Sequence, residues 1–371
     1  MLKAYQYRLY PTKAQVSTLN RTFDLCRKVY NNTLALRRDS WDYDSKSVSL
    51  FETNKELTGW KRDHPELSSV YSQVLQNVQV RVDLAFKAFF QRVKKGGDKT
   101  GYPRFKSYNR YDSITYPQSG FNLNVQNQIV YASKIGKIKA VIHRPVEGTI
   151  KTMTIRRSCA GKWYVSFVAE YDPEIKDHQN DEVTGIDLGL TTFAMFANGE
   201  KIENPRFFRS EEKELAKVQR RLSKEKKGTL EHKRRRLIVA KVHDRIANKR
   251  KNFIHQESRK LVDRFKVIVF EDLNIKNMQH DSYLAKSIAD VSWGMMVQAT
   301  QNKAEEAGSQ VVLVNPINTT QFCSRCGKIV RKELSNRIHD CPFCGLIMDR
   351  DQNAAINIMR LGLQSLPAES G

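Results

Sequence analysis

The first hundred residues combine one alternating stretch with two helical ones. In residues 4–10, AYQYRLY, Tyr5 and Tyr7 alternate with small or polar residues, which predicts a strand with one buried face. Apolar residues then recur every three or four positions over residues 16–30 and again over residues 67–93. This period predicts two amphipathic helices after the strand.

Between residues 110 and 180 the hydrophobic period falls to two. Four short stretches alternate in this way and predict strands: NQIVYA, KIKAVIH, KTMTIRR and KWYVSFVAEY. SCAG joins the last two, and its glycine predicts a hairpin turn. Several short strands, with the helical stretch inserted after the first strand of the chain, predict a small all-β barrel that carries a helical insertion.

The second half of the chain has a different pattern. It follows DHQNDE, residues 177–182, a polar linker that predicts a domain boundary. VTGIDLGL and TTFAMFA predict the opening strands of a mixed sheet, and KVIVFEDL and QVVLVNP are continuous apolar runs of the kind found in buried strands. Helices are expected near residues 292–307 and 352–363, so this half is expected to be of the α/β class.

The chain is long and strongly basic. Its 371 residues are enough for two or three domains. The 63 Lys and Arg outnumber the 40 Asp and Glu and give a net charge of +23, which favours a polyanionic partner. The sequence has no run of about 18 apolar residues and no signal-peptide core near Met1. Nucleic acid is therefore favoured over a membrane surface.

Basic residues are concentrated between Arg209 and Lys266, where 21 Lys and Arg stand against 8 Asp and Glu. Gly228 divides this span into two predicted helices. A charge run is usually a solvated surface. Here Leu237 and Val242 add an apolar side, which is expected to dock beside the sheet. The basic side would then contact phosphates without distinguishing bases.

Four of the six cysteines have the spacing of a metal site. Cys323 and Cys326 are followed, fourteen residues later, by Cys341 and Cys344. Each pair can hold one side of a tetrahedral ion, and the glycine after each pair lets backbone amides turn back toward the sulfurs. Four thiolates leave no open coordination position, so the spacing predicts a structural zinc ion. Cys26 lies outside the cluster and is interpreted as a small core residue.

Three acidic residues occur at positions that suggest a specific role, two of them in apolar runs and one at an expected helix start. Asp187 interrupts the buried-looking strand TGIDLGLT, and Glu271 ends the apolar run KVIVF. A carboxylate in such a place is unfavourable unless it is paired or binds a metal ion. Asp351 stands directly before QNAAINIMRL, at an expected helix start, where a carboxylate can bind first-turn amides and still reach a metal ion.

Each acid also has a purely structural interpretation, as a turn residue, a surface acid at a strand end or a helix cap. Taken together they suit another role. Hydrolysis of a phosphodiester by two divalent ions, about 3.5 to 4 Å apart, needs carboxylates that converge from separated parts of the chain. We therefore expect Asp187, Glu271 and Asp351 to meet around shared magnesium ions.

These motifs resemble those of the TnpB family, transposon-encoded RNA-guided DNA nucleases related to type V CRISPR effectors. The stretches that carry the resemblance occur in the family's order and spacing: GIDLGLTTFA, RIANKRKNFIHQESRKLVDRFKVIVFEDLNIKNM, NTTQFCSRCG and CPFCGLIMDRDQNAAINI. YRLYPT and GYPRFKS also fit, whereas residues 40–65 and 110–150 are only loosely similar. The resemblance thus covers most of the chain.

The resemblance implies an RNase H-like RuvC nuclease domain with an inserted zinc ribbon, the target-strand loading module. It also implies an N-terminal wedge β-barrel interrupted by a helical recognition module. The implied ranges are 1–10 and 101–180 for the wedge barrel, 11–100 for the helical module, 181–316 and 347–371 for the RuvC-like domain, and 317–346 for the zinc ribbon.

Carried over by position, the family's catalytic acids fall on Asp187, Glu271 and Asp351. Asp351 is favoured over Asp349 because the family keeps the acid two residues before Asn353. In addition, Asp349 is expected to lie a turn outside the helix. Asp349 stays open as the alternative. The two asparagines of QNAAIN are expected to pack or hydrogen-bond on the inner side of the helix.

The implied cofactors are Mg²⁺, in a two-metal catalytic site, and structural Zn²⁺. The implied partners are a guide RNA and a double-stranded target DNA that is recognised beside a short flanking motif. The protein would act in the prokaryotic cytoplasm, at the nucleoid, as a monomer on its RNA, with a dimer left open. Tyr102 could stack on bases or simply anchor its loop. The candidate nucleic-acid contacts are Arg234, Arg235, Arg236, Arg250, Lys251, Tyr102 and Arg337, of which Arg337 matches a basic position near the scissile phosphate.

Two other functions fit part of the sequence. An RNA-guided DNA-binding protein without cleavage, such as a repressor, would share the architecture but would not need all three acids. An unguided DNA-binding protein or transposition accessory factor would need only the charge and the zinc module. The leading hypothesis is a hydrolase, an RNA-guided DNA endonuclease that depends on Mg²⁺.

Overall fold

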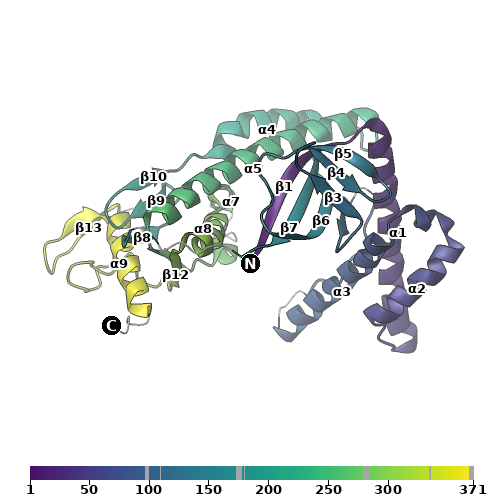
Figure 1. The fold of residues 1–371 in the computed structure, drawn as a ribbon. Helices are drawn as coiled ribbons and strands as arrows, with labels where there is room; N and C mark the ends of the chain where they lie inside the picture. Colours follow the sequence, from purple (N-terminus) through teal and green to yellow (C-terminus); the bar gives the residue numbers. More distant parts are fainter. Residues whose placement is uncertain are drawn as a thin grey trace. The chain divides into compact units, whose positions relative to one another are not determined.

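The structure, a computed structural model, contains two compact units, Met1–Asp172 and Pro173–Gly371, drawn in Figure 1. It describes residues 1–96, 100–108, 110–172, 178, 180–278, 285–333 and 336–366. Each unit has its own hydrophobic core. The division between them lies close to the boundary predicted at residues 177–182, of which residues 177 and 179 are outside the described residues.

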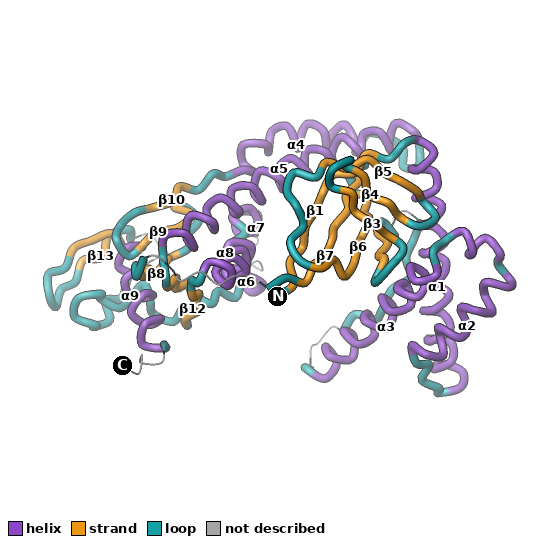
Figure 2. The backbone as a smooth tube through the Cα atoms, in the orientation of Figure 1, coloured by secondary structure: helices purple, strands orange, loops and turns teal. Residues whose placement is uncertain are grey.

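The first unit is built on a seven-stranded antiparallel sheet, whose strands are orange in Figure 2. The strands are β1 (Leu2–Tyr10), β2 (Ser113–Tyr116), β3 (Phe121–Asn124), β4 (Ile129–Ala132), β5 (Gly136–Val141), β6 (Thr149–Arg157) and β7 (Trp163–Glu170). Their order is β2-β6-β7-β1-β5-β4-β3. The predicted first strand, the four predicted later strands and the β6–β7 hairpin are confirmed, whereas β2 and β3 were not predicted.

Aromatic side chains bring the two edges of this sheet together. The ring of Tyr116 in β2 lies 6.5 Å from that of Phe121 in β3, and Phe121 lies 6.3 Å from Phe167 in β7. The Tyr116 hydroxyl also donates to the Ser133 carbonyl oxygen at 2.9 Å. The sheet is therefore curled around its core, but within the described residues β2 and β3 are not paired by hydrogen bonds.

Helices fill the long connection between β1 and β2 and pack against the sheet. They are α1 (Lys13–Asp44), α2 (Leu50–Asp63), the short 3₁₀ helix η1 (Pro65–Ser69) and α3 (Ser72–Lys94). Thr12 begins α1 with a capping box, in which Thr12 and Gln15 bind each other's backbone amide. The helix predicted over residues 67–93 begins later than expected, because Pro65 opens a 3₁₀ turn first. The α2 helix was not predicted.

The second unit is built on a five-stranded mixed sheet, as predicted from its apolar runs. The strands are β8 (Val183–Asp187), β9 (Thr192–Phe196), β10 (Lys201–Glu203), β11 (Val267–Glu271) and β12 (Gln310–Val314), in the order β10-β9-β8-β11-β12. The strands β8, β11 and β12 are parallel, and β9 and β10 are antiparallel to their neighbours.

Helices cover both faces of the parallel strands. They are α4 (Phe207–Ser223), α5 (Leu230–Arg264), α6 (Ile275–Met278), α7 (Ala285–Val291), α8 (Trp293–Ala307) and α9 (Arg350–Ser365). Alternate strand residues such as Val183 and Val269 pack with α9, and the residues between them, such as Ile186 and Phe270, pack with α5 and α8. Among the described residues, no helix is long and apolar enough to cross a membrane.

The basic span forms a hairpin of two helices, α4 and α5, that is split at Gly228 as predicted. Val242 is buried, but it packs against α4 and not beside the sheet, and Leu237 is exposed. The expected apolar side is therefore only partly correct. A buried carboxylate, Glu211, joins the two helices by accepting hydrogen bonds from Arg245 at 3.1 Å and Lys249 at 2.7 Å.

The final helix, α9, lies directly on β8. A Cβ atom built on Gly185 would stand 2.1 Å from the carbonyl oxygen of Ala355 and 2.4 Å from the amide nitrogen of Met359. Gly362 makes a similar contact from the helix side, because its Cβ would stand 2.4 Å from the Val269 side chain. No side chain larger than hydrogen fits at either position, so the two glycines fix where α9 crosses the sheet.

We expect Gly185→Ala to lower the free energy of unfolding of the second unit by about 3 kcal/mol, because α9 must move off the strand to accommodate a methyl group. Hydrogen exchange of the β8 and β11 amides measures this change. Gly59→Ala is the matched control, since nothing lies within 4 Å of its Cβ position in α2; it should stabilise its helix by up to about 1 kcal/mol. Equal exchange rates in the Gly185 variant and the wild type would contradict the contact.

Candidate active site and metal centre

Two of the three predicted acids stand side by side at the edge of the parallel strands. Ile186 pairs with Phe270 across β8 and β11, and Asp187 and Glu271 are the next residue of each strand. Neighbouring strands lie about 4.8 Å apart, and residues in register point to the same face. The two carboxylates therefore share the face of the sheet that carries Gly185 and is covered by α9.

Asp351 reaches the same region from α9. Ala355 contacts Gly185, and Asp351 lies one turn before Ala355 on the same side of the helix. Asp187 lies two residues beyond Gly185 on the same side of the strand. A helical turn and two strand residues advance by similar lengths, about 5.4 Å and about 6.6 Å. The single contact at Gly185 thus brings Asp351 near Asp187.

The electrostatics of Asp187 agree with this proximity. Burial, and then the charges of Glu271 and Asp351, raise the pKa of Asp187 to about 8, and Arg350 acts in the opposite direction. Part of the Asp187 side chain reaches solvent, but protein surrounds the carboxyl group on most sides. Burial also raises the pKa of Glu271, although its hydrogen bond from the Thr319 hydroxyl, 2.5 Å long, lowers it. The site concentrates negative charge that a cation would relieve.

Asp349, and not Asp351, caps α9. Its carboxylate accepts hydrogen bonds from the amides of Asp351 at 2.8 Å and Gln352 at 3.2 Å. The expectation that Asp349 lies a turn outside the helix is therefore wrong, because Asp349 is the N-cap and Asp351 belongs to the first turn. The exposed carboxylate of Asp349 is committed to the helix start, which leaves the half-buried carboxylate of Asp351 for the site.

Two arginines hold Asp351. The Arg350 guanidinium lies 3.1 Å from one carboxylate oxygen, and the Arg337 guanidinium lies 3.9 Å from the other. Arg350 also donates to the Asn336 carbonyl oxygen at 3.0 Å, and Arg337 donates to the Thr191 hydroxyl at 3.2 Å. Because Arg350 is buried and Arg337 is largely exposed, Arg350 orients the carboxylate while Arg337 stays open to solvent.

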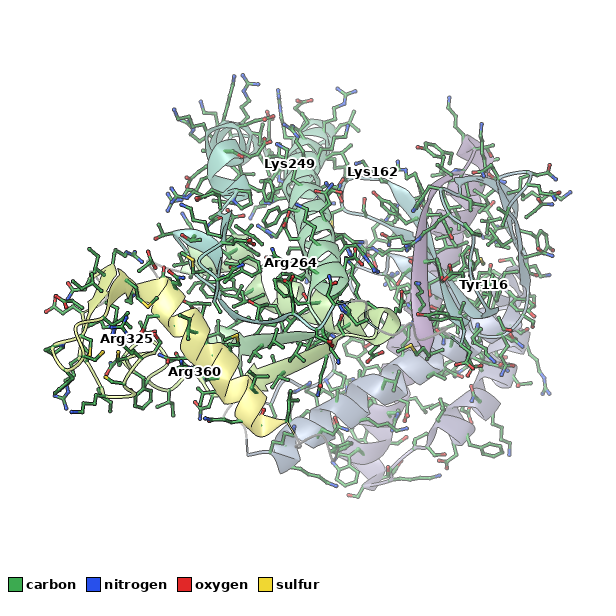
Figure 3. All side chains as sticks on the ribbon, turned by 60° about the vertical axis from the view of Figure 1, so that its left-hand side comes forward. Tyr116, Lys162, Lys249, Arg264, Arg325 and Arg360 are labelled. Atoms are coloured by element: carbon green, nitrogen blue, oxygen red, sulfur yellow. The ribbon has the colours of Figure 1, made fainter. Side chains whose placement is uncertain are left out.

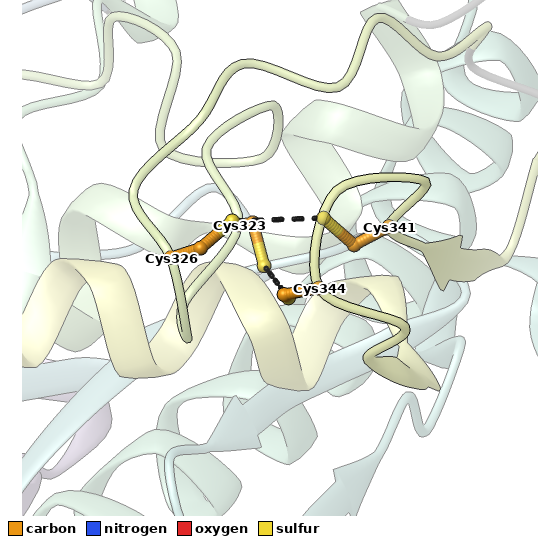
Figure 4. A group of neighbouring side chains, drawn as sticks. All are labelled: Cys323, Cys326, Cys341 and Cys344. Carbon is orange, nitrogen blue, oxygen red and sulfur yellow. Dashed lines mark hydrogen bonds between the residues drawn. The ribbon is translucent and has the colours of Figure 1, made fainter.

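The four predicted cysteines come together, as Figure 4 shows. Among the described residues, their four sulfur atoms make up a group of potential metal ligands in which every donor atom lies within 4.8 Å of the others. The carboxylates of the three acids do not form such a group. Two sulfur pairs are 3.6 and 3.7 Å apart. A tetrahedral Zn²⁺ with bonds of about 2.3 Å holds its sulfurs about 3.8 Å apart, so the cluster fits zinc.

The two halves of the cluster repeat one backbone pattern. The amides of Cys323 and Cys341 each donate to the carbonyl oxygen five residues later at 2.9 Å. Gly327 and Gly345, at φ +72° and +69°, each donate back to the first cysteine of their pair, also at 2.9 Å. The predicted positive φ is confirmed at both glycines. Burial raises the pKa of the Cys341 thiol, but hydrogen bonds from the amides of Phe343 and Cys344 and with the sulfurs of Cys344 and Cys323 lower it below its usual value, whereas burial and the neighbouring sulfurs raise the pKa of Cys344. The lowered pKa favours a thiolate at Cys341.

Hydrogen bonds from α9 tie the cysteine segment to the acids. The side-chain amide of Asn353 donates to the Phe322 carbonyl oxygen at 2.7 Å, and its oxygen accepts from the Ser324 amide at 2.9 Å. Asn357 donates to the carbonyl oxygens of Thr319 at 2.9 Å and of Phe322 at 2.7 Å. Since Thr319 also binds Glu271, the network runs from the four-cysteine segment to the acidic site. The expected inward hydrogen bonding of both asparagines is confirmed.

Several contributors to the site were missed in the sequence. Thr319 and Arg350 stand inside the recognised stretches NTTQ and DRDQN, so their positions beside motif residues were the available signal. A cavity of about 570 Å³ borders Arg337 and is also lined by Arg206, Arg209 and Lys286. These three cations are 131, 128 and 51 positions from Arg337 in the sequence (337 − 206, 337 − 209 and 337 − 286), and nothing in the sequence pattern indicates that they gather beside it.

The candidate nucleic-acid contacts have different surroundings. Arg234, Arg236 and Lys251 are exposed on α5, whose basic side chains are drawn in Figure 3. Arg235 is half-buried and pairs with Glu231 at 2.9 Å. Arg250 forms an ion pair of 2.8 Å with Asp290, and only 21% of its side chain is exposed. Because Asp290 also accepts hydrogen bonds from the Phe208 amide in the first turn of α4, Arg250 has a structural role and is a poor candidate for phosphate contact.

Known protein families match three parts of the chain. The models are described as "Probable transposase" for residues 166–281, "Cas12f1-like, TNB domain" for residues 293–358, and "Helix-turn-helix domain" for residues 1–46. A protein of Streptomyces pristinaespiralis named "Putative RNA-guided DNA endonuclease" is 34% identical over 100% of this chain and 91% of its own length. The chain belongs to the TnpB family.

Other relatives of this TnpB-family chain are more distant. "Putative RNA-guided DNA endonuclease InsQ" of Escherichia coli (strain K12) is 29% identical over 97% of this chain and 92% of its own length. The solved structure of the mini-RNA-guided endonuclease CRISPR-Cas_phi3 matches with a TM-score of 0.50 at 9% identity, covering 100% of this chain and 94% of that one. This likeness supports a RuvC-like nuclease fold. Residues 1–46, matched as helix-turn-helix, form β1 and the continuous helix α1.

We expect Cys344→Ser to reduce bound zinc and to expose residues 320–346 to protease, because this segment has no core of its own without the metal ion. Zinc content and limited proteolysis measure the two effects. The hydrogen bonds from Asn353 and Asn357 predict that protection of the α9 amides falls as well. Cys159→Ser, at an exposed cysteine outside the cluster, is the control. Unchanged proteolysis after zinc loss would contradict this role.

The raised pKa of Asp187 predicts how stability depends on pH without magnesium. An acid whose pKa is about 8 when folded and 3.8 in its ordinary state binds more protons in the folded chain. The free energy of unfolding therefore falls as the pH rises between these values. Asp187→Asn should flatten this dependence and raise the melting temperature at pH 8, in magnesium-free buffer that contains zinc. An equal dependence of the free energy of unfolding on pH in the variant and the wild type would show that folding does not raise the pKa of Asp187.

Proposed function

We propose that this chain is an RNA-guided DNA endonuclease, which hydrolyses phosphodiester bonds of target DNA paired to a transposon-derived guide RNA beside a short flanking motif. The observation that carries the proposal is that Asp187 and Glu271 stand side by side at one edge of the parallel strands, with Asp351 of α9 near enough for its charge to act on Asp187. Membership of the TnpB family and the names of the relatives agree with it.

The proposal assigns a role to each part of the chain. The first unit would combine a wedge barrel, residues 1–10 and 101–180, with a helical recognition module, residues 11–100. The second would be the RuvC-like nuclease domain, residues 181–316 and 347–371, with the target-strand loading zinc ribbon at residues 317–346. The pairing of β1 with β5 and β7 supports the first assignment, because it makes the helices an insertion into a continuous sheet.

Asp187, Glu271 and Asp351 would hold two magnesium ions. Bound magnesium supplies a water-derived nucleophile at neutral pH and stabilises negative charge on the phosphate that is attacked. Asp187 must give up its proton to act as a ligand, so metal binding and deprotonation are coupled at this residue. Arg350 keeps Asp351 oriented, and the exposed Arg337 is placed to contact a phosphate beside it. The zinc ion would be structural, since four thiolates complete its coordination.

The nucleic acids would be held mainly through phosphates. The cavity beside Arg337 is lined by three further cations, Arg206, Arg209 and Lys286. It adjoins the loop that follows Asp187, so a strand bound there would reach the acids. Exposed basic residues on the α4–α5 hairpin, such as Arg234, supply further positive charge. Such contacts are independent of sequence and weaken steeply with salt, which leaves target choice to base pairing.

A protein that only binds DNA has no use for the clustered acids. Burial together with the charges of Glu271 and Asp351 raises the pKa of Asp187, so three ionised acids destabilise the fold when no cation is present. Keeping such a cluster at the edge of a sheet is explained by metal-dependent chemistry. The acids therefore favour cleavage over the binding-only alternatives.

We expect Asp187→Ala and Asp351→Asn to abolish magnesium-dependent cleavage of target DNA and to leave RNA binding largely intact. Asp349→Asn is the matched control. It removes a neighbouring carboxylate, but asparagine also caps helices, so cleavage should stay close to that of the wild type. Cleavage of labelled target DNA by the protein and its copurified RNA provides the measurement.

Two outcomes would contradict the assignment. Normal cleavage by Asp187→Ala would show that the acids do not carry the chemistry. Loss of cleavage in Asp349→Asn with full activity in Asp351→Asn would exchange the roles of these two aspartates.

A further inference from the structure

One segment of the first unit has no helix or strand but is fixed in place. Residues 101–108, GYPRFKSY, lie against α1 and α3. Asn31 of α1 binds the backbone of Lys106 twice, donating to its carbonyl oxygen at 3.0 Å and accepting from its amide at 2.8 Å. Arg92 of α3 donates to the Gly101 carbonyl oxygen at 2.9 Å. Both ends of the segment are thus held by side chains of the helices.

The fixed segment exposes three aromatic rings, at every third position. The exposed fractions are 42% for Tyr102, 47% for Phe105 and 71% for Tyr108. Tyr102 nevertheless has its ring against Phe86 and Phe89, with centroids 5.5 and 5.3 Å away, so it anchors the segment to α3. Phe105 and Tyr108 have no such aromatic neighbour among the described residues.

The rings of Phe105 and Tyr108 are each backed by an arginine of α1. The guanidinium of Arg38 lies 5.1 Å from the Phe105 ring centre, and that of Arg27 lies 5.9 Å from the Tyr108 ring centre. These arginines are eleven positions apart, close to three turns of 3.6 residues, and so share one side of α1 with Asn31. A cation over an aromatic ring occupies one face and leaves the other available.

Acidic residues orient both arginines. Asp24 accepts hydrogen bonds from Arg27 at 2.8 and 3.0 Å, and Asp39 accepts from Arg38 at 2.9 Å. Each guanidinium is thus held by a carboxylate and lies near a ring. Residues 101–110 add Arg104, Lys106 and Arg110 and contain no acid, so the segment also offers charges to phosphates.

We propose that Phe105 and Tyr108 form a stacking site for unpaired nucleotides of the guide RNA. The assignment of the nucleic acid as guide RNA rests on the function proposed above. The ring that anchors the segment, Tyr102, packs against Phe86 and Phe89, whereas the exposed rings of Phe105 and Tyr108 lie against an arginine of α1 and have no such ring contact among the described residues. Stacking a base on such a ring costs little ordering entropy and suits any base sequence. Unpaired bases are the usual target of aromatic stacking in RNA recognition, and target DNA arrives as a duplex with its bases inside.

The test compares stacking with charge in one titration series. The variants are Phe105→Ala, Tyr108→Ala and the double variant. Their affinities are measured for four nucleic acids: the copurified RNA, an unstructured RNA of about 20 nucleotides, the single-stranded DNA of the same sequence and the RNA duplex. Each affinity is measured at several salt concentrations. Phe51→Ala is the matched control, because Phe51 is an aromatic ring, 80% exposed, on α2 of the same unit.

We expect each alanine variant to bind the single-stranded RNA roughly fivefold or more weakly, with little effect on the duplex. The dependence of log affinity on log salt should keep the wild-type slope, because a lost stack releases no counterions. Arg104→Gln should instead reduce that slope by about one contact. Phe105→Tyr and Tyr108→Phe keep an aromatic ring and should restore binding, which separates stacking from a folding defect.

Three results would overturn the proposal. They are affinities equal to those of Phe51→Ala, a loss confined to single-stranded DNA, and a loss that the aromatic replacements do not restore. None of them depends on cleavage, so the stacking site can fail while Asp187→Ala still identifies the nuclease. Conversely, a protein that never cuts DNA could still show the expected loss of affinity for unstructured RNA.

Discussion

The arrangement of the acidic site depends on backbone contact between α9 and β8 at Gly185. With no side chain on the strand, the carbonyl of Ala355 and the amide of Met359 come within van der Waals distance of the strand itself. The contact fixes how closely α9 approaches the sheet and where it crosses β8, and therefore fixes the position of Asp351 relative to Asp187. A larger residue at position 185 would displace a carboxylate that is 166 residues away in the sequence (351 − 185). The chemistry of the site thus depends on a position that contributes no functional group.

The same region balances electrostatic cost against hydrogen bonding. Burial and the neighbouring negative charges disfavour the ionised form of Asp187. The other two acids have partners: the Thr319 hydroxyl donates to Glu271, and Arg350 and Arg337 form ion pairs with Asp351. The four-cysteine segment contributes through α9, because Asn353 and Asn357 bind the backbone that leads into it and Thr319 binds Glu271. The segment that carries the four cysteines therefore helps to orient catalytic candidates in a neighbouring site. This coupling gives the inserted segment a structural role in the nuclease unit besides any contact with nucleic acid.

The two units use different means to present side chains to a polyanion. In the second unit, regular strands and a helix position the acids, and the α4–α5 hairpin carries exposed cations on a helical scaffold. In the first unit, the segment of residues 101–108 has no regular structure, and its order comes from Asn31, Arg92 and the packing of Tyr102. Hydrogen bonds from helix side chains thus take the place that ladder hydrogen bonds have in the sheet.

The sequence by itself determined the grouping of the four cysteines, the buried strands of the second unit and the identity of the three acids as candidates, because spacing and hydrophobic period are local properties. It did not determine α2, β2 and β3, whose short or mixed patterns acquire meaning only when α3 and the curled sheet bury them. It misplaced Asp349, since the first residue of a helix is set by which side chain binds the free amides, and two aspartates in DRD could each have done so. It also did not separate Arg250, which forms an ion pair with Asp290, from the exposed cations around it. Tertiary structure decided the contacts of Thr319 with Glu271 and of Arg337 with Asp351, because each joins residues whose separation in the chain carries no periodic signal.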